Sequence, residues 1–250
     1  MSKKISVCIA TYNGEKYIKE QVDSIIRQLG PNDEVIISDD ESSDATINIL
    51  EDYHDDRIII YHHVSKGANS FEKATANFEN ALNHATGDFI FLSDQDDIWR
   101  EGKVKTMTEA LKHNLFVQCQ LETFGVVDDN LNHILGPLPK SLIYCLYKLP
   151  FVGCCMGFRR ELLELALPFP KGIRVHDAWL GMIGKISGRA AFVSNPFQLY
   201  RLHNNNVSGS AKSDNSLFVK LSYRLILLYN VIIRYLNNRS YIDTIQNRIA

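Results

Sequence analysis

The chain has 250 residues, of which 45% are hydrophobic and 22% are charged, and its formal net charge is −2. These values are typical of a globular protein with one large domain, so wholesale disorder is excluded and no nucleic-acid partner is indicated. The charge is unevenly spread, because residues 212–250 hold six lysines and arginines against two aspartates, a net charge of +4.

Strands and helices alternate along the first hundred residues. Short apolar runs predict strands at 5–10, 35–37, 58–61 and 89–92. Apolar residues at helical spacing predict the intervening helices at 18–29, 44–50 and 71–85. Such alternation builds βαβ units, so we expect an α/β fold with a Rossmann-like, mostly parallel central sheet and helices on both faces.

Beyond residue 115 the alternation is less regular. The same criteria predict strands at 116–125, 190–193 and 197–200 and helices at 161–167 and 178–186. We expect one domain over residues 1–210, with halves at 1–99 and 100–210. Residues 211–250 would then form a smaller C-terminal element, a basic amphipathic helical tail.

Cysteine usage and the lack of long apolar segments indicate the compartment. Five cysteines without a CxxC pair favour a reducing environment over a disulfide framework or a zinc site. The N-terminus passes directly into a strand without a signal sequence, and no run reaches the roughly 20 apolar residues that span a bilayer. We therefore expect a cytoplasmic protein, peripheral on the inner face of the membrane at most.

The strand at 89–92 is followed by Asp94, Asp96 and Asp97 within four positions. Carboxylates crowded at the end of a buried strand repel one another, and a divalent cation removes that repulsion. Hard oxygen ligands suit Mg²⁺ or Mn²⁺, and open α/β sheets bind ligands beyond the carboxyl ends of their strands. The cluster is therefore a candidate metal site, with a solvated acidic turn as the alternative.

Polar residues also follow the other strands of the first half. A glycine turn at 11–15 leads into the first helix and offers backbone N–H groups to a phosphate. Asp39 and Asp40 follow the second strand and could accept hydrogen bonds from a base or a ribose. Lys66 precedes the third helix and could neutralise a diphosphate. Each alone has a structural explanation, but four such sites at four strand ends make coincidence implausible.

These stretches together resemble the nucleotide-binding half of a family 2 glycosyltransferase with the GT-A fold. In the first half the resemblance lies in VCIATYNGE at 7–15, IISDDESSDAT at 36–46 and GDFIFLSDQDDIW at 87–99. In the second half it lies in GCCMGF at 153–158, HDAWL at 176–180 and YRLHNNNVSG at 200–209. The later stretches are similar to the rhamnosyltransferase-like branch, which builds bacterial surface polysaccharides.

The resemblance implies an inverting transfer from a nucleoside-diphosphate sugar, dTDP-rhamnose or a UDP-hexose, to a hydroxyl of a saccharide or lipid-linked saccharide. The first half would bind the donor and residues 100–210 the acceptor. Asp177 would act as the base, and Asp96 would ligate Mg²⁺ or Mn²⁺, with His203 as a further metal ligand or a phosphate contact. The implied donor-binding residues are Thr11, Tyr12, Asn13, Glu15, Asp39, Lys66 and Asp94.

Several alternatives remain at this point. Asp177 could instead be a helix N-cap, and His176 stands where the family often has glutamate. The apolar, basic segment 217–236 could lie on a membrane, pack on the domain or form a dimer interface. Two other functions are a non-catalytic nucleotide-sugar-binding protein and a phosphatase of the haloacid dehalogenase type. The oligomeric state is not indicated by any motif.

Overall fold

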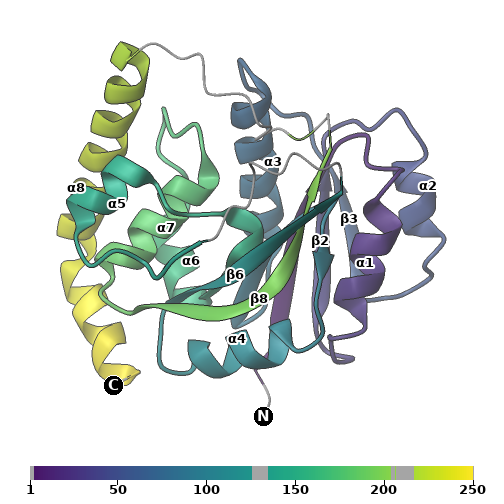
Figure 1. Ribbon diagram of the computed structural model, residues 1–250, viewed down its shortest axis with the longest axis horizontal. Coiled ribbons are helices and arrows are strands. Elements are labelled where there is room, and N and C mark those ends of the chain that lie inside the picture. The colour runs from purple at the N-terminus through teal and green to yellow at the C-terminus, as the bar shows by residue number, and fades with distance from the viewer. Residues whose placement is uncertain (1–2, 126–134, 204–205, 207–216, 250) are drawn as a thin grey trace.

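The computed structural model describes residues 3–125, 135–203, 206 and 217–249. In this part of the chain an eight-stranded sheet lies at the centre, in the order β3-β2-β1-β4-β7-β6-β8-β5 (Figure 1). The strands are β1 (Ile5–Thr11), β2 (Glu34–Asp39), β3 (Ile58–His62), β4 (Phe89–Asp94), β5 (Ile98–Trp99), β6 (Phe116–Gly125), β7 (Met156–Arg159) and β8 (Ala190–Leu202). The helices are α1 (Ile18–Ile26), α2 (Thr46–Glu51), α3 (Ser70–His84), α4 (Lys103–Leu111), α5 (Leu142–Lys148), α6 (Arg160–Ala166), α7 (His176–Ile186) and α8 (Leu217–Arg248), with a 3₁₀ turn at Gly153–Cys155.

The first half has the predicted alternation. Strands β3, β2, β1 and β4 pair in parallel, and the helices α1, α2 and α3 connect them. Because parallel strands end at the same edge, the residues after β1, β2 and β4 lie close together. The register places Thr11 opposite Asp39, and Ala10 opposite Asp94. The α/β fold with a mostly parallel sheet is confirmed.

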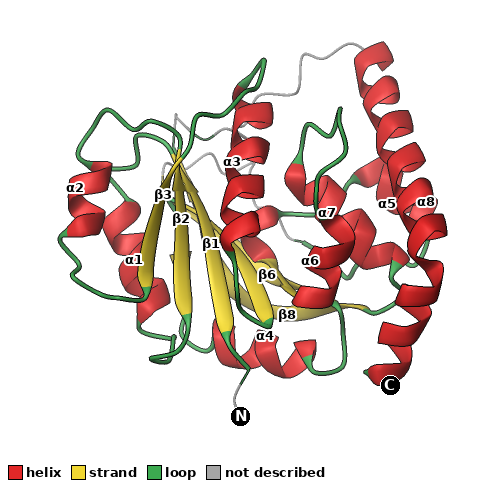
Figure 2. Ribbon diagram, turned by 180° about the vertical axis from the view of Figure 1, so that it is seen from behind, coloured by secondary structure: helices red, strands yellow, loops and turns green. Residues whose placement is uncertain are grey.

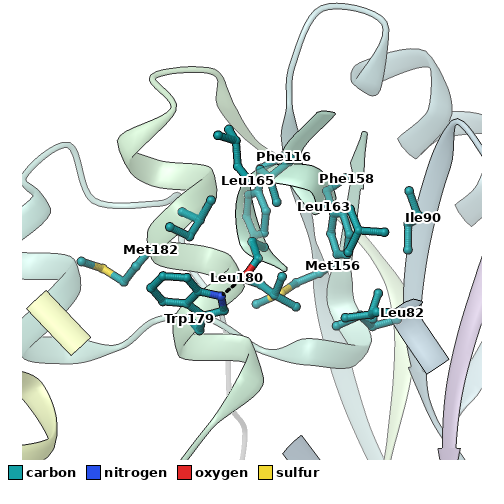
Figure 3. Close-up of a cluster of buried hydrophobic side chains, with 14 of the residues drawn as sticks. Leu82, Ile90, Phe116, Met156, Phe158, Leu163, Leu165, Trp179, Leu180 and Met182 are labelled. Atoms are coloured by element: carbon teal, nitrogen blue, oxygen red, sulfur yellow. Dashed lines mark hydrogen bonds between the residues drawn. The ribbon is translucent and has the colours of Figure 1, made fainter. Parts of the chain in front are cut away.

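Successive residues of each buried strand point to opposite faces of the sheet, and each face carries its own core. Val7 and Ile9 pack on one face with residues of α1, α2 and α4, whereas Cys8 packs on the other with residues of α3, α6, α7 and α8. Figure 2 shows these helices on the two sides of the strands. Figure 3 shows the second core around Trp179, whose indole N–H donates to the carbonyl of Ala166 at 3.0 Å. Helices on both faces are therefore confirmed.

The strands of the second half differ from the prediction in two respects, and the helices α4 and α5 were not predicted. The strands expected at 190–193 and 197–200 are one strand, β8, which pairs in parallel with β6 through irregular register around Gln120 and Pro196. Pro196 has no backbone N–H to donate to the ladder, which fits the irregular register there. It interrupts the apolar pattern of the sequence, but the strand continues past it. In addition β7, which was not predicted, lies antiparallel between β4 and β6 and joins both halves in one sheet.

The C-terminal segment is a long helix, α8, with non-helical backbone at Asn238. It packs beside α5, α6 and α7 and contributes Leu227, Val231 and Ile245 to the core of that face. Its role as a tail separate from residues 1–210 stays a prediction, since the boundary at 210 lies outside the described residues. Among the described residues no helix is both long and apolar enough to cross a bilayer.

Candidate active site

The carboxyl ends of β1 and β2 are joined through side chains. The hydroxyl of Thr11 donates to Asp39 Oδ1 at 2.9 Å, and both residues are buried, at 1% exposure. The backbone N–H of Ser42 donates to Asp39 Oδ2 at 3.0 Å, and its hydroxyl donates to Oδ1 at 2.5 Å. Asp39 is thus held rigidly at the floor of the site, with hydrogen bonds on both of its oxygens.

The turn after β1 is attached to the turn before α2. Asn13 Oδ1 accepts the backbone N–H of Ser43 at 2.8 Å, and Glu15 Oε2 accepts that of Ala45 at 2.9 Å. Both side chains therefore brace the two turns. Tyr12 is 59% exposed, so its ring lies at the surface of the turn. Asn13 and Glu15 are also exposed, but their side chains are engaged in these hydrogen bonds.

Gln95, the middle residue of the Asp94–Asp96 motif, connects this turn to the acidic loop. Its Oε1 accepts the backbone N–H of Tyr12 at 2.8 Å, and its Nε2 donates to the Tyr12 carbonyl at 3.0 Å. A Cβ on Gly14 would lie 2.6 Å from that Oε1, so glycine leaves the room that this contact needs. The turn after β1 and the acidic loop are thereby held in one arrangement.

Asp96 and His203, which lie far apart in the chain, are in direct contact. Asp96 Oδ2 is 2.7 Å from His203 Nε2, and the two side chains are 14% and 12% exposed. The imidazole stacks on Tyr17 with ring centroids 4.9 Å apart. Arg201 holds the acidic loop from the same strand end, because its Nε donates to the Asp96 carbonyl at 2.8 Å.

Asp97 is fully buried beneath this loop. Its Oδ2 accepts Gln198 Nε2 at 2.7 Å, and its Oδ1 accepts the backbone N–H of Arg201 at 2.9 Å. Burial and the charge of Asp96 raise the pKa of Asp97 to about 7. Since both of its oxygens are engaged within the protein, Asp97 supports the loop from below.

A buried lysine completes this support. Lys103 has no exposed surface, and its ammonium donates to Gln198 Oε1 at 2.6 Å and to the Cys154 carbonyl at 2.8 Å. It also lies over the ring of Trp99, 4.1 Å from the centroid. Gln198 thus links a buried cation to the buried Asp97, which offsets part of the cost of burying either charge. No sequence motif indicated a role for Lys103 or Gln198.

Asp177 lies in the first turn of α7 and faces the same acidic group. Burial and the charges of Asp97, Asp96 and Asp177 raise the pKa of Asp94 well above its usual value. Burial also raises the pKa of Asp177 itself to about 6, although the backbone N–H groups of Ala178 and Gly153 partly offset the shift. Both carboxylates border the 3₁₀ turn at Gly153–Cys155, because the Cβ of Asp177 lies 3.7 Å from where a Cβ on Gly153 would be, and a carboxylate oxygen of Asp94 lies within 4.8 Å of the Cys154 sulfur.

The neighbour of Asp177, His176, carries no positive charge to counteract this shift. Burial lowers the pKa of His176 to about 3, and its ring stacks on Phe78 with centroids 4.1 Å apart. A Cβ on Gly153 would lie 2.8 Å from His176 Nε2, so the glycine lets the ring approach. His176 is a neutral packing residue at the edge of the site.

Lys66 is exposed in the loop between β3 and α3. The backbone of that loop is tied to the site, because the N–H of Ser65 donates to Asp40 Oδ1 at 2.6 Å. Placement at the phosphates therefore stays a prediction for Lys66.

A family model described as glycosyl transferase family 2 matches residues 6–165, well over half of the chain. The chain belongs to that family. It is therefore a glycosyltransferase, and the phosphatase interpretation is wrong, because the strand and the acidic motif belong to a different enzyme family.

Two curated relatives of this glycosyltransferase come from bacteria. It is 27% identical over 225 residues to "dTDP-rhamnosyl transferase RfbG" of Shigella flexneri. The matched region covers 85% of this chain and 78% of the relative. It is 31% identical over 171 residues to "UDP-Glc:alpha-D-GlcNAc-diphosphoundecaprenol beta-1,3-glucosyltransferase WfgD" of Escherichia coli. That matched region covers 66% of this chain and 64% of the relative.

A solved structure shares the fold. The structure of S. aureus TarS 1-349 in complex with UDP-GlcNAc matches 98% of this chain and 71% of the TarS chain, with a TM-score of 0.70 and 21% identity. The GT-A fold inferred from the sequence motifs is therefore confirmed.

The donor atoms at the acidic loop fit a divalent cation of the kind that glycosyltransferases of this family generally use. Asp96 and His203 present a carboxylate oxygen and an imidazole nitrogen that already converge, and Asn206 Nδ2 lies 3.5 Å from Asp96 Oδ2. Ligand atoms of Asp94, Asp97 and Cys154 also lie within 4.8 Å of one another. That second group suits a hard cation less well, because Asp97 is engaged on both oxygens and a thiol is a soft ligand.

Proposed function

We propose that this glycosyltransferase moves a sugar, with inversion at the anomeric carbon, from a nucleoside-diphosphate sugar to a hydroxyl of a bacterial surface polysaccharide. The observation that carries the proposal is that Asp177 and Asp94 both border the turn at Gly153–Cys155, while Asp96 in the same acidic loop meets His203. A base and a donor-binding loop within one site are what a single displacement needs.

On the donor side, Asp39 and Thr11 would form the floor beneath the nucleoside, and Tyr12 would offer its exposed ring to the base. Asn13 and Glu15 would keep the turn in place through their contacts with the turn before α2. Asp94 would contact the ribose or the sugar, and Lys66 would approach the diphosphate. The related RfbG and WfgD support dTDP-rhamnose or UDP-glucose as the donor.

Asp96 and His203 would hold Mg²⁺ or Mn²⁺. The bound cation would supply Lewis-acid stabilisation of the charge on the departing nucleoside diphosphate. The combination of one carboxylate and one imidazole favours Mn²⁺ over Mg²⁺, because Mg²⁺ prefers all-oxygen ligands. Arg201 and Gln95 would keep Asp96 in position through the backbone of the loop.

On the acceptor side, Asp177 would take the proton of the attacking hydroxyl. A carboxylate with a pKa near 6 is largely ionised at neutral pH, and it is a stronger base than an exposed aspartate. WfgD supports an acceptor linked to a diphosphate lipid, so the reaction would take place at the cytoplasmic face of a membrane.

Calorimetric titration with dTDP, UDP, GDP and CDP, with and without Mn²⁺, tests the donor site. We expect one nucleotide to bind with metal, and Asp96→Asn to weaken that binding by about tenfold or more. Asp56→Asn provides the control. This exposed aspartate precedes β3, so it lies at the amino ends of the parallel strands, whereas the site lies at their carboxyl ends. If no nucleotide binds in the presence of metal, the donor site is wrong.

A transfer assay with the nucleotide sugar so identified then separates an enzyme from a non-catalytic binding protein. Wild type should consume the donor, by transfer or by slow hydrolysis. Asp177→Asn should bind the nucleotide with unchanged affinity and lose transfer. Equal activity of both proteins would remove Asp177 from the mechanism.

A further inference from the structure

The outer face of α8 carries an exposed apolar stripe. Its side chains recur every three or four residues, which places them on one side of the helix. The stripe consists of Leu221 (58% exposed), Leu225 (58%), Tyr229 (64%), Ile232 (42%) and Leu236 (60%). A row of five large apolar side chains exposed on one helix face is uncommon on a monomeric protein, because such patches mark interaction sites. The stripe therefore indicates a binding surface.

The opposite face of α8 already packs on the domain. Tyr223, Leu227 and Val231 recur at four-residue spacing and are 9%, 0% and 0% exposed. At 100° per residue this row lies on the side of the helix opposite the stripe. The domain therefore accounts for one apolar face of α8 and leaves the other without a partner among the described residues.

The neighbouring helix α5 extends the apolar surface. Ile143, Tyr144 and Tyr147 are 78%, 49% and 65% exposed. Arg224 of α8 holds α5 in place, since its Nη2 donates to the Tyr147 carbonyl at 3.0 Å. Figures 1 and 2 show α5 beside α8 at the same end of the molecule. Tyrosines at the margin of an apolar surface are typical of segments that lie at a membrane–water interface.

The charges around the stripe are positive. The sequence has no aspartate or glutamate at 130–160 or at 215–242, so α5 and the part of α8 that bears the stripe carry no carboxylate. Asp243 lies seven residues beyond Leu236, near the end of α8. Exposed Lys148 lies at the end of α5, with its ammonium 5.4 Å from the ring centroid of Tyr147. Exposed Lys171 precedes Gly172, whose added Cβ would lie 3.3 Å from Ile226 of α8. Basic side chains thus border the apolar surface on both sides.

We propose that α8 and α5 form a membrane-docking surface that lies in the interface of a bilayer with anionic lipids. Apolar side chains would enter the acyl boundary while the lysines face acidic headgroups. A second copy of the chain is a poorer occupant, because a symmetric contact through this surface would bring basic residues together, and neither α5 nor residues 217–242 of α8 offers a carboxylate to neutralise them.

The same helix would couple the membrane to the active site. Helix α8 packs on α7, whose first turn holds Asp177. Burial, followed by the charge of Asp177, raises the pKa of Tyr223 on the inner face of α8. A bilayer on the outer face would therefore be separated from the base by at least the diameter of α8, roughly 10 Å. This coupling rests on the proposed function, because it requires a lipid-linked acceptor at the site, whereas the docking surface does not depend on that function.

Sedimentation of the full chain with vesicles tests the proposal. Wild type should bind vesicles of equal parts phosphatidylcholine and phosphatidylglycerol, bind pure phosphatidylcholine more weakly, and be partly released by salt. The variant Leu225→Gln/Tyr229→Gln/Leu236→Gln should bind the acidic vesicles about tenfold or more weakly. The matched control Leu225→Met/Tyr229→Phe/Leu236→Met keeps the surface apolar and should bind like wild type.

Folding and nucleotide binding are measured separately for each variant, by circular dichroism and calorimetry. Because the stripe is solvent-exposed, both should match wild type, so a loss of vesicle binding would not reflect unfolding. Absence of wild-type binding to acidic vesicles would overturn the proposal even if the nucleotide binds. Concentration-dependent dimers that the glutamine variant abolishes, without vesicle binding, would also overturn it and assign the stripe to a second copy.

Discussion

At the scale of single residues, the site is built from carboxylates whose environments differ. Asp39 and Asp97 are buried and hydrogen-bonded on both oxygens, which suits supporting roles. Asp96 is partly exposed and faces an imidazole. Burial disfavours the charged form of Asp177, although backbone N–H groups at Ala178 and Gly153 partly offset this effect on its pKa. Residues of one type thus acquire different chemistry from their partners.

The raised pKa of Asp177 predicts a pH dependence. The carboxyl has a pKa of about 6 in the folded protein and near 4 when unfolded, so the base is ionised only above about pH 6. We expect kcat/KM to rise tenfold per pH unit below that value and to level off above it. A profile that stays flat down to pH 5 would exclude Asp177 as the base.

The variant Asp177→Asn gives the control for this assignment. Transfer should fall by about 10²–10⁴-fold and lose the pH dependence near 6. The folded state favours the neutral carboxyl, so this group stabilises the protein most below its unfolded pKa and loses that contribution as the pH rises through 6. At pH 7 the neutral asparagine should therefore raise the free energy of unfolding by about 1–2 kcal/mol, measured by urea denaturation.

The buried ammonium of Lys103 predicts a combined effect on stability and on the acidic loop. Lys103→Met keeps the volume but leaves Gln198 Oε1 and the Cys154 carbonyl without their donor. We expect the free energy of unfolding to fall by about 2–4 kcal/mol in urea denaturation. Metal-dependent nucleotide affinity should also fall. Lys105→Met, at a solvent-exposed position of the same helix, should change neither quantity.

At the scale of elements, the position of Asp177 depends on how closely α7 packs. Gly181 and Gly184 lie on one face of α7, where an added Cβ would be 2.2 Å from the ring of Phe151 and 2.5 Å from that of Phe116. Only glycine permits this approach, which aligns the start of the helix with the acidic loop. A packing feature outside the site thus decides where the base lies.

This packing predicts that Gly184→Ala destabilises the protein, although alanine is the better helix former. The methyl group would overlap Phe116, and overpacking of this kind costs about 1–3 kcal/mol in the free energy of unfolding. Thermal unfolding measures the loss. Gly136→Ala is the matched control, because nothing lies within 4 Å of its added Cβ. Equal stability of both variants would contradict the packing argument.

At the scale of the whole molecule, α8 packs against residues 1–210 along one of its faces. Leu227 and Val231 are fully buried in the core that also contains Trp179 and Phe116. Arg234 joins α8 to the end of α6, because its Nη1 donates to the Leu165 carbonyl at 2.8 Å. The packing alternative for this segment is thus confirmed on one face, while membrane contact stays a proposal on the other.

The two faces of α8 predict opposite results for two leucines two positions apart. Leu227→Ala removes a fully buried side chain and should lower the free energy of unfolding by about 2–4 kcal/mol. Leu225 is 58% exposed, so Leu225→Ala should change it by less than about 0.5 kcal/mol. Urea denaturation of both variants gives the comparison. A large loss for Leu225→Ala would mean that the stripe is covered within the protein.

Much of the first half was determined by local sequence. Apolar runs of three to six residues separated by helical periodicity specify parallel strands, and parallel strands must end at one edge. The meeting of Thr11, Asp39 and Asp94 follows from that geometry. The motifs are also local, so they indicated the family without any knowledge of the three-dimensional contacts.

Only the tertiary structure decided which distant residues meet. The contact of Asp96 with His203 and the position of Asp177 depend on β7 and β8 joining the sheet, and long-range strand pairing leaves no local signal. Lys103 was missed because a lysine on an amphipathic helix usually faces water, and its burial depends on Gln198 from a remote strand. Likewise, the apolar pattern of α8 showed that the helix needs cover, but only packing separated the face that the domain buries from the face that it leaves to solvent.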